Sequence, residues 1–500
     1  MKALGRIALG CALALTVLAG CAGGPSASGK KLDADVIVVG SGLAGTGAAY
    51  SAVSQGAKVL LIEKNGMLGG TSLISSGTFC AALSKEQEAK GIKDSYQLNI
   101  DDVNRIGHNK ADQNILKKYV VEAAGVWQWF LDKGMKPNAK APYIDPVHSA
   151  YSVARTMGPE KGMAAEYTKV MMGQIDANYK DNLTALVNTK VTGLVKEGGK
   201  VVGVTTTGPN GDRTYRAKAV VLASGGYSSN TAMIAKYTPQ YAHYLHITGA
   251  WATGECLEYA EAAGAQLVNM DYIDGYFAGI PKADNNYEVG FGDLTSGFAD
   301  RWLGDIWVDS NGRRFVNEDD GDEDPREVAM QGVKDGKMLI VFDQGILEAN
   351  NSKTPLRNFD KLLETGYAVK KADSPEELAK AFNVDPAGLA ATIKAVNDGA
   401  AAGKTDEFGK TTAKTFGKGP YYGILCYPTI FMTYGGIRVD TELRALDSKG
   451  VALPGLYVAG ESMGVTQWAG HGMPGGMGVG PAIVFGLDAG REAAAYAKAN

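Results

Sequence analysis

The sequence predicts an α/β protein: a Rossmann-like dinucleotide-binding domain built from both ends of the chain, with an inserted α+β domain. Three observations carry this prediction. A strand, a glycine turn, a helix and a second strand follow one another near the N-terminus. Buried-strand patterns that end in small residues recur at 217–227 and 455–461, and a mixed pattern separates them from about 245 to 415. The first of these is the dinucleotide-binding signature.

The glycine turn follows the β-branched strand pattern "ADVIVVG" and contains Gly40, Gly42 and Gly45. The first glycine permits the tight turn, the second lets a pyrophosphate approach the backbone, and the third lets helix and strand pack closely. The following helix offers free N–H groups to phosphates. The second strand, "AKVLLIEK", carries Glu63, whose carboxylate suits a ribose diol. The motif alone does not choose between FAD and NAD, and a purely structural glycine turn is the alternative.

Later segments complete the domain plan. They are a Gly/Ser/Thr-rich stretch at 65–79, two strands joined by a tight turn at 186–207, two capped helices at 374–403, short strands and turns from 417, and a glycine loop leading into a helix at 472–497. We therefore expect the nucleotide domain to comprise residues 33–245 and 416–500, with the inserted domain at 246–415.

Composition excludes several other classes. The chain has 500 residues and a net charge of −4, and it lacks basic blocks, which argues against a nucleic-acid partner. Cys80, Cys256 and Cys426 are far apart and form no CxxC, so haem, iron–sulfur and zinc spacings are missing from the sequence. We expect three buried free thiols and no metal. The acidic run "EDDGDED" (318–324) lacks the EF-hand positions and is expected to be a solvated loop.

The N-terminus reads as a targeting segment. Lys2 and Arg6 precede a short apolar stretch that is typical of a secretory signal and too short for an ordinary membrane span. "LTVLAGC" resembles a bacterial lipobox, which implies a signal peptide at 1–21, lipidation of Cys21, and a flexible tether at 22–32. Plain signal cleavage or an unprocessed anchor are the alternatives. The resemblance places the mature protein on the extracytoplasmic face of the cell membrane.

Several blocks in this order resemble the FAD-dependent fumarate reductase family, which includes urocanate reductases and 3-ketosteroid dehydrogenases. They are "VVGSGLAG", "LIEK", "LGGTS", "SSG", "VVLASGGY", "NGRRFVNE" and "PGLYVAGE", and the similarity runs from Ala34 to about Ala497. The resemblance implies FAD as cofactor and a substrate-capping role for the inserted domain. The implied cofactor-binding residues are Gly40, Gly42, Ala44, Gly45, Glu63, Lys64, Gly70, Thr71, Ser72, Ser76, Gly77, Val191, Ala223, Gly225, Glu255, Glu461, Gly478 and Val479.

The catalytic residues that the resemblance implies are matched less well. The family's proton-donating arginine corresponds to Arg326 only if four extra residues are allowed, and a relay arginine corresponds to Arg301. Phe298 stands where the relay glutamate is expected. Further candidates are the phenols of Tyr276 and Tyr434, which can donate to a substrate carbonyl, and His471 beside the flavin loop. The alternatives are a surface arginine for Arg326, an ion-pair partner for Arg301, packing for the tyrosines and a structural role for His471.

The dicarboxylate clamp of the family is missing. Its two histidines correspond to Tyr276 and Met432, and its arginine corresponds to Met473. A bidentate arginine suits a carboxylate, and burying an unpaired carboxylate costs several kcal/mol, on the order of 2–7 for polar groups and more for charges. A surface of Tyr276, Phe431, Met432, Tyr434 and Met473 therefore predicts a largely neutral aromatic or alicyclic substrate.

The expected reaction is reduction of an activated C=C bond, of enone or acrylate type, by hydride transfer from flavin N5 plus protonation. Export would require a separate electron donor, such as a membrane cytochrome or a flavin carrier, and favours anaerobic respiration with an extracellular alkene as acceptor. The alternatives are oxidation like that of a 3-ketosteroid dehydrogenase, reduction of a small carboxylate such as fumarate or urocanate, and a non-catalytic ligand-binding lipoprotein.

Overall fold

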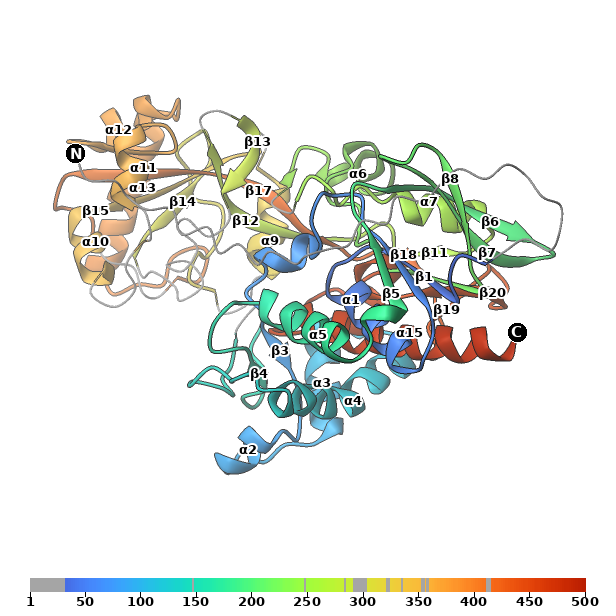
Figure 1. Cartoon of the computed structure of the whole chain (residues 1–500). Helices are drawn as coiled ribbons and strands as arrows, with labels where there is room; N and C mark the ends of the chain where they lie inside the picture. The colour runs from blue at the N-terminus through green and yellow to red at the C-terminus, as the bar shows by residue number, and fades with distance from the viewer. Residues whose placement is uncertain are drawn as a thin grey trace, which may run out of the picture. The chain divides into compact units, whose positions relative to one another are not determined.

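A computed structural model (Figure 1) describes residues 32–500 apart from nine gaps: 146–147, 247–248, 283–284, 291–303, 321–323, 334–335, 352–355, 357–358 and 411–414. It also leaves out some side chains within helices and strands, such as that of Tyr276. The predicted signal peptide with Cys21, nearly all of the tether, and Arg301 lie outside the described residues. Within the described part of the chain, no helix is both long and apolar enough to cross a bilayer.

The central sheet joins strands from both ends of the chain, which confirms the predicted fold class. Its order is β19 (Arg444–Leu446), β20 (Ala452–Val458), β9 (Ala219–Leu222), β1 (Val36–Val39), β2 (Val59–Ile62) and β5 (Leu183–Leu186). All neighbours are parallel except β19 and β20. Every residue of β1, β2 and β9 is buried, as expected for parallel strands covered on both faces.

Two helices pack together beside this sheet, α1 (Leu43–Ser54) and α15 (Val479–Ala499). Their backbones touch: a Cβ on Gly486 would lie 2.3 Å from the oxygen of Ala44, and one on Gly490 would lie 2.1 Å from that of Ala48. Because both residue numbers rise together, the helices run parallel. The small residues of these two segments therefore allow a close helix pair.

A three-stranded sheet contacts the central sheet through β7. It consists of β6 (Lys190–Glu197), β7 (Lys200–Thr207) and β8 (Arg213–Arg216), and β6 and β7 form the predicted tight-turn pair. The chain between residues 85 and 178 adds helices for which the sequence patterns gave no prediction. These are α2 (Lys85–Ala89), α3 (Tyr96–Ile106), α4 (Gln113–Asp132) and α5 (Ala165–Asn178).

The inserted part of the chain is built around a second sheet. Its order is β10 (Leu245–His246), β13 (Asn285–Gly290), β12 (Ile273–Lys282), β17 (Tyr421–Thr433), β15 (Met338–Asp343) and β14 (Ile306–Val308), with β16 (Val369–Ala372) also paired to β17. The short strands expected beyond residue 417 are wrong for β17, which extends over 13 residues. It is long because β12, β15 and β16 all pair with it.

Helices flank this second sheet. They are α9 (Asp324–Gln331), α10 (Gln344–Asn351), α11 (Phe359–Thr365), α12 (Pro375–Ala381) and α13 (Pro386–Ala401). The last two confirm the pair predicted at 374–403, and the side chains of Ser374 and Asp385 cap them. Smaller elements are β3 (Phe79–Cys80) with β4 (Thr156–Met157), β11 (Leu267–Val268) with β18 (Gly436–Ile437), α6 (Thr231–Tyr237), α7 (Glu255–Ala262) and α14 (Thr466–Ala469).

Buried apolar side chains form two clusters. One draws on residues 34–273 and 430–497, and the other on residues 280–426. Strands β12 and β17 run from one cluster into the other, since Ile273 and Ile430 belong to the first while Ile280 and Cys426 belong to the second. The domain boundaries near 245 and 415 stay predictions. The thiols of Cys80, Cys256 and Cys426 are buried and free, as expected.

Candidate active site

The glycine turn between β1 and α1 has no room for side chains. Gly40 has a φ of 94°, and a Cβ there would lie 2.4 Å from the oxygen of Ala223. A Cβ on Gly45 would lie 1.9 Å from the oxygen of Gly40. Gly42 precedes α1 without a side-chain cap, and the first turn of the helix holds no acidic residue. The turn therefore presents backbone N–H groups to whatever approaches it.

Glu63 fixes this turn to the end of β2. Its Oε2 accepts hydrogen bonds from the backbone N–H of Ser41 at 3.0 Å and from the Ser41 hydroxyl at 2.6 Å. Its Oε1 accepts from the N–H of Asn65 at 2.9 Å. The buried carboxylate thus has a structural role that the sequence analysis missed, beside the ribose contact that stays a prediction.

The 3-10 helix η1 (Gly70–Ile74) supplies polar groups next to the turn. The hydroxyl of Ser72 accepts a hydrogen bond from the N–H of Leu43 at 3.0 Å, and the hydroxyl of Thr71 accepts one from the Trp251 indole at 2.9 Å. Gly77 follows with a φ of 82°, and a Cβ there would lie 2.7 Å from the nitrogen of Ala164. Ser76 is exposed. These positions leave hydroxyl groups along one side of the glycine turn.

Glu255, at the start of α7, connects the turn to β6. Its carboxylate lies 3.2 Å from Lys64 Nζ and 2.9 Å from Lys190 Nζ. Burial alone would raise the pKa of Glu255, but the hydrogen bond from Thr253, the pairing with Lys190 and the charge of Lys64 outweigh it and lower this pKa to about 2. Val191 is buried on β6 beside this pair. The carboxylate is therefore ionised at all ordinary pH values.

Glu461, just after β20, connects the end of β17 to the turn that follows β9. It accepts hydrogen bonds from the N–H and the hydroxyl of Thr433, at 2.9 and 2.8 Å, and from the N–H of Gly226. A Cβ on Gly226 would lie 2.3 Å from its Oε1. Burial raises the pKa of Glu461 despite these donors. Gly478 precedes α15 without a side-chain cap or an acidic first turn.

These features fit an FAD. Two parallel helices, α1 and α15, begin at glycines that provide no side-chain cap, and the positive ends of their dipoles favour an anionic group such as a pyrophosphate. The glycine turn accepts close backbone approach because no Cβ fits there. Most of the predicted cofactor residues thus lie at strand ends and helix starts around the central sheet, while Val191 lies on β6 of the three-stranded sheet. Ala44 and Val479 lie in the first turns of α1 and α15, Gly70 begins η1, and Ala223 and Gly225 follow β9. The contact that each residue makes stays a prediction.

Aromatic and sulfur side chains gather beyond the start of α15. The rings of Tyr272 and His471 stack at 4.0 Å, and Tyr434 meets Tyr272 edge-on at 5.1 Å. A Cβ on Gly478 would lie 3.4 Å from the sulfur of Met473 and 3.8 Å from that of Met432. We call these five side chains (Tyr272, Met432, Tyr434, His471 and Met473) the aromatic–methionine wall. It contains both methionines, Met432 and Met473, for which the resemblance predicted clamp positions.

Tyr434 is fully buried, and its hydroxyl has no hydrogen-bond partner among the described residues. Burial and the charges of Asp274, Glu327 and Asp324 raise its pKa well above the ordinary value, with Tyr272 contributing as well. A buried hydroxyl without a partner costs about 1–3 kcal/mol. This atom is therefore a candidate contact for a ligand. Burial, with the charges of Lys110 and His108, lowers the pKa of His471, although Asp271 opposes this.

Arg326 lies on α9 and is buried, so the alternative of a surface arginine is wrong. Its Nη1 lies 3.5 Å from the oxygen of Glu318, and its guanidinium lies 5.9 Å from the centre of the Trp307 ring. Its role as a proton donor stays a prediction. Tyr276 lies on β12 opposite Thr429, and its side chain is outside the described part of the structure. Arg301 is likewise outside it.

The acidic run at 318–324 is not simply a solvated loop, as the sequence analysis expected. Glu318 is buried and pairs with Arg314 at 2.7 Å and with Lys410 at 3.2 Å. Asp324 begins α9 and faces two histidines. Basic side chains therefore contact both ends of the run. The acidic composition of the run alone could not predict these contacts.

One of those histidines, His148, belongs to a group of side chains that the sequence analysis missed. His148 Nε2 lies 3.5 Å from Asp274 Oδ1, while its Nδ1 lies 3.4 Å from Asp324 Oδ1 and 3.9 Å from Glu327 Oε1. We call these four side chains the histidine–acid cluster. The donor atoms of His148, Asp274 and Glu327 lie within 4.8 Å of one another, a spacing that could admit a metal ion. However, the ring directs its two nitrogens at different carboxylates, which is the geometry of an imidazolium between acids.

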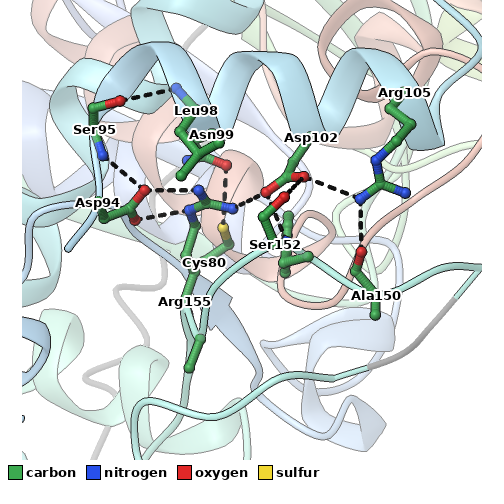
Figure 2. Close-up of polar contacts among 12 residues, drawn as sticks. Cys80, Asp94, Ser95, Leu98, Asn99, Asp102, Arg105, Ala150, Ser152 and Arg155 are labelled. Carbon is green, nitrogen blue, oxygen red and sulfur yellow. Dashed lines mark hydrogen bonds and ion pairs between the residues drawn. The ribbon is translucent and has the colours of Figure 1, made fainter. Parts of the chain in front are cut away.

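A buried arginine holds the segment that carries His148 (Figure 2). Arg155 is fully buried and bonds Asp94 through Nε and Nη2, at 2.8 and 2.7 Å, and Asp102 through Nη1. Asp102 also accepts from the N–H and hydroxyl of Ser152, at 2.9 and 2.6 Å. Arg105 donates to the oxygen of Ala150 at 2.7 Å. These contacts fix residues 150–155 to α3. No motif in the sequence predicted them.

Comparison with known proteins agrees with the site. The FAD binding domain family model matches residues 35–477. The chain is 32% identical to a fumarate reductase (cytochrome) from Shewanella frigidimarina over 469 residues, which are 93% of this chain and 78% of that protein. It is 31% identical to the urocanate reductase of Eggerthella lenta over 482 residues, 94% of this chain and 76% of that one.

Two further relatives differ in how much of them is covered. The vinyl phenol reductase of Lactiplantibacillus plantarum is 28% identical over 501 residues, with 92% of this chain and 96% of that protein covered. The chain is also 30% identical to the NADH:fumarate oxidoreductase of Klebsiella pneumoniae over 479 residues. The aligned part is 95% of this chain but only 49% of that protein, so the chain spans about half of its length.

Solved structures share the fold. The open conformation of a flavocytochrome c3 fumarate reductase aligns with a TM-score of 0.79 at 28% identity and covers 93% of this chain and 78% of that one. A 3-ketosteroid delta1-dehydrogenase from Sterolibacterium denitrificans aligns with a TM-score of 0.78 at 22% identity, over 92% and 99%. The chain therefore belongs to the FAD binding domain family and is an FAD-dependent oxidoreductase related to the fumarate and urocanate reductases.

Proposed function

We propose that this protein reduces an activated C=C bond in a largely neutral aromatic or alicyclic substrate. The reaction class is supported by relatives that are named fumarate, urocanate and vinyl phenol reductases. The substrate class is supported by the aromatic–methionine wall, in which Met432 and Met473 stand at the positions of the implied carboxylate clamp.

The observation that carries this proposal is the surroundings of the Tyr434 hydroxyl. It is buried and has no partner among the described residues, and the charges of Asp274, Glu327 and Asp324 help to raise its pKa. A substrate carboxylate placed at this hydroxyl would meet the same negative charges that raise the pKa of Tyr434. A neutral carbonyl or phenol instead gains a hydrogen bond without that repulsion. The site therefore favours a neutral group over an anion.

Each side chain has a distinct part in the reaction. When bound and reduced by the electron donor, FAD would supply the hydride that such a reduction requires. Met432 and Met473 offer adaptable apolar contact to a ring. Tyr434 keeps its proton because its pKa is raised, so it can donate a hydrogen bond that polarises an electron-withdrawing carbonyl. The proton for the neighbouring carbon comes from Tyr434 or Arg326, and a guanidinium needs a dry site with a relay to act as an acid.

We propose further that the protein is exported and anchored by a lipid on Cys21, with electrons delivered by a separate membrane cytochrome or flavin carrier. The lipobox-like "LTVLAGC" supports the anchor. Labelled palmitate should enter the wild-type protein and not the Cys21→Ser variant. Label in both variants, or in neither, would contradict the anchor while leaving the enzyme assignment intact.

Anaerobic turnover with reduced methyl viologen as donor tests the proposed function. The panel contains fumarate, urocanate and acrylate as anions, and enones, vinyl phenols and unsaturated 3-ketosteroids as neutral substrates. We expect the neutral aromatic or alicyclic members to turn over faster than every anion. Faster turnover of fumarate or urocanate would contradict the substrate class. Dye reduction driven by a saturated ketosteroid, without reductive turnover, would contradict the direction.

A further inference from the structure

We propose that His108, Asp324, His148 and Asp274 form a route that carries protons from the protein surface to Tyr434 in the aromatic–methionine wall. The route rests on the proposed function, because each reduced double bond consumes one proton together with one hydride. Its four side chains come from three distant parts of the sequence, and none belongs to the catalytic residues that the sequence predicted.

The outer end of the route is open to solvent. The His108 side chain is 51% exposed, and its Nε2 lies 2.6 Å from Asp324 Oδ2. The other oxygen of Asp324 lies 3.4 Å from His148 Nδ1. One carboxylate thus contacts an exposed imidazole through one oxygen and a buried imidazole through the other. The exposed imidazole of His108 therefore gives the route its contact with bulk water.

The middle of the route is the His148 ring, whose side chain is only 2% exposed. A proton taken up at Nδ1 from the Asp324 side gives an imidazolium, and release from Nε2 to Asp274 leaves a neutral ring. The contacts of 3.4 and 3.5 Å exceed the ordinary N–H···O distance of about 2.9 Å, so a small rotation shortens one at a time. A metal ligand would instead point one nitrogen at a shared ion.

Backbone strain marks both histidines. His108 and His148 each have a φ of 55°, in the left-handed region that residues other than glycine rarely adopt. Such conformations cost about 1–3 kcal/mol and persist where the surroundings enforce them. Here the Arg155 pairs hold residues 150–155 on α3, as in Figure 2. Gly107 packs against Ala469, where a Cβ would lie 1.9 Å from the Ala469 oxygen.

The inner end reaches the wall. Asp274 on β12 is the strand partner of Met432 on β17. Asp274 is also the first of the charges that, after burial, raise the pKa of Tyr434. The hydroxyl of Tyr434 has no partner among the described residues, so the last transfer needs a bridging water. When Tyr434 gives its proton to the substrate it becomes a phenolate, and a proton from Asp274 then restores the phenol. Because His148 reaches the substrate only through Asp274 and Tyr434, we call it a positioning residue.

The charges around His148 support a proton carrier. Asp274 faces it from β12, and Asp324 and Glu327 face it from α9, the helix that also carries Arg326. Burial lowers the pKa of His148, but the charges of Asp274 and Glu327 and the bonds with Asp274 and Asp324 raise it well above its usual value.

The test compares His148→Gln and His108→Gln with His243→Gln, a control because His243 lies outside the cluster. We expect His148→Gln to lower kcat by about 100-fold, the usual size of acid–base catalysis, with an altered pH profile and an unchanged FAD content. His108→Gln should lose about threefold in weak buffer and recover in concentrated imidazole, because a buffer can replace a surface proton collector. His243→Gln should match the wild type.

A second readout does not depend on turnover. Nitrogen NMR should show His148 protonated above neutral pH, and Asp274→Asn should lower its pKa. Unchanged kcat and pH profile in a folded, FAD-loaded His148→Gln, or an unchanged His148 titration in Asp274→Asn, would overturn the route. So would one bound metal per chain that is lost in His148→Gln. If the wild type reduces no alkene while the His148 titration is as expected, the proposed function fails and the coupled cluster stands without a catalytic use.

Discussion

The nucleotide end of the site and the aromatic–methionine wall are built in different ways. At the nucleotide end, the shape of the backbone determines the site. Gly40 and Gly45 leave no room for a Cβ, and the Glu63 carboxylate accepts hydrogen bonds from the backbone N–H groups of Ser41 and Asn65. At the wall and the histidine–acid cluster, the important atoms belong to side chains from separate segments, such as Tyr434 in the wall and His148 and Asp324 in the cluster.

This difference explains how each end responds to change. A backbone cradle depends on a few residues that are close in sequence, and it tolerates no added atom. A side-chain cluster depends on the packing that brings distant segments together, so its weak points lie outside it. Arg155 is such a point, because it fixes the segment next to His148 without touching the wall.

The largest effect is expected from Arg155→Met, which breaks the support of the segment next to His148. It leaves Asp94 and Asp102 buried without their cation, and removal of one partner of a buried pair costs about 3–5 kcal/mol. Urea unfolding measures this loss. Arg105→Met is the matched control, since Arg105 bonds the same Asp102 from a half-exposed position and should cost about 1 kcal/mol or less. Equal costs for the two variants would contradict the assignment of Arg155.

The next effect is expected from Gly45→Ala, which breaks the backbone cradle. The added Cβ would lie 1.9 Å from the oxygen of Gly40, so the turn must move, at a cost of about 3 kcal/mol and with loss of FAD on purification. Gly125→Ala is the control, because Gly125 is also in a helix and has open space around it. That change should stabilise the protein by about 0.5–1 kcal/mol. FAD retention by Gly45→Ala at the wild-type level would refute the tight fit.

A smaller effect is expected from Met473→Arg, which alters the wall alone. A guanidinium at this position offers a carboxylate the bidentate partner it lacks, so relative turnover of anionic over neutral alkenes should rise by about 10-fold. Met473→Leu keeps the apolar character and should preserve the preference. An equal rise in the relative turnover of anionic alkenes in Met473→Leu would show that the size of the side chain, and not its charge, determines the substrate preference.

The smallest effect is expected from Glu255→Gln at the nucleotide end. The folded pKa of Glu255, about 2, lies below its usual 4.5, so its stabilisation is present above pH 4.5 and is lost as the pH falls toward 2. Glu255→Gln should therefore destabilise the protein near neutral pH by about 1 kcal/mol or less, and have a flatter acid limb. Exposed Glu258, on the same helix, gives the control Glu258→Gln. Identical acid limbs in all three proteins would contradict the lowered pKa.

The same contrast explains what the sequence could predict. The glycine turn, both chain ends in one sheet and the α12–α13 pair follow from local patterns, because spacing and capping act within a few residues. The histidine–acid cluster has no such pattern: His148 and Asp324 lie 176 positions apart. The sequence also could not predict that Arg326, Arg155 and Glu318 are buried. The burial of each side chain depends on partners that the tertiary fold brings near it. The sequence analysis also predicted short strands where the structure has the long strand β17. That strand is long because three neighbouring strands pair with it.

The most direct measurement is single-turnover reoxidation of the photoreduced protein by two substrates of one shape, benzylideneacetone and cinnamate. They differ in a methyl ketone against a carboxylate at the activated double bond. We expect the ketone to reoxidise the FAD at least about 10-fold faster, because the carboxylate meets the acids around Tyr434 without a clamp. Equal rates, or faster reoxidation by cinnamate, would contradict the neutral-substrate assignment.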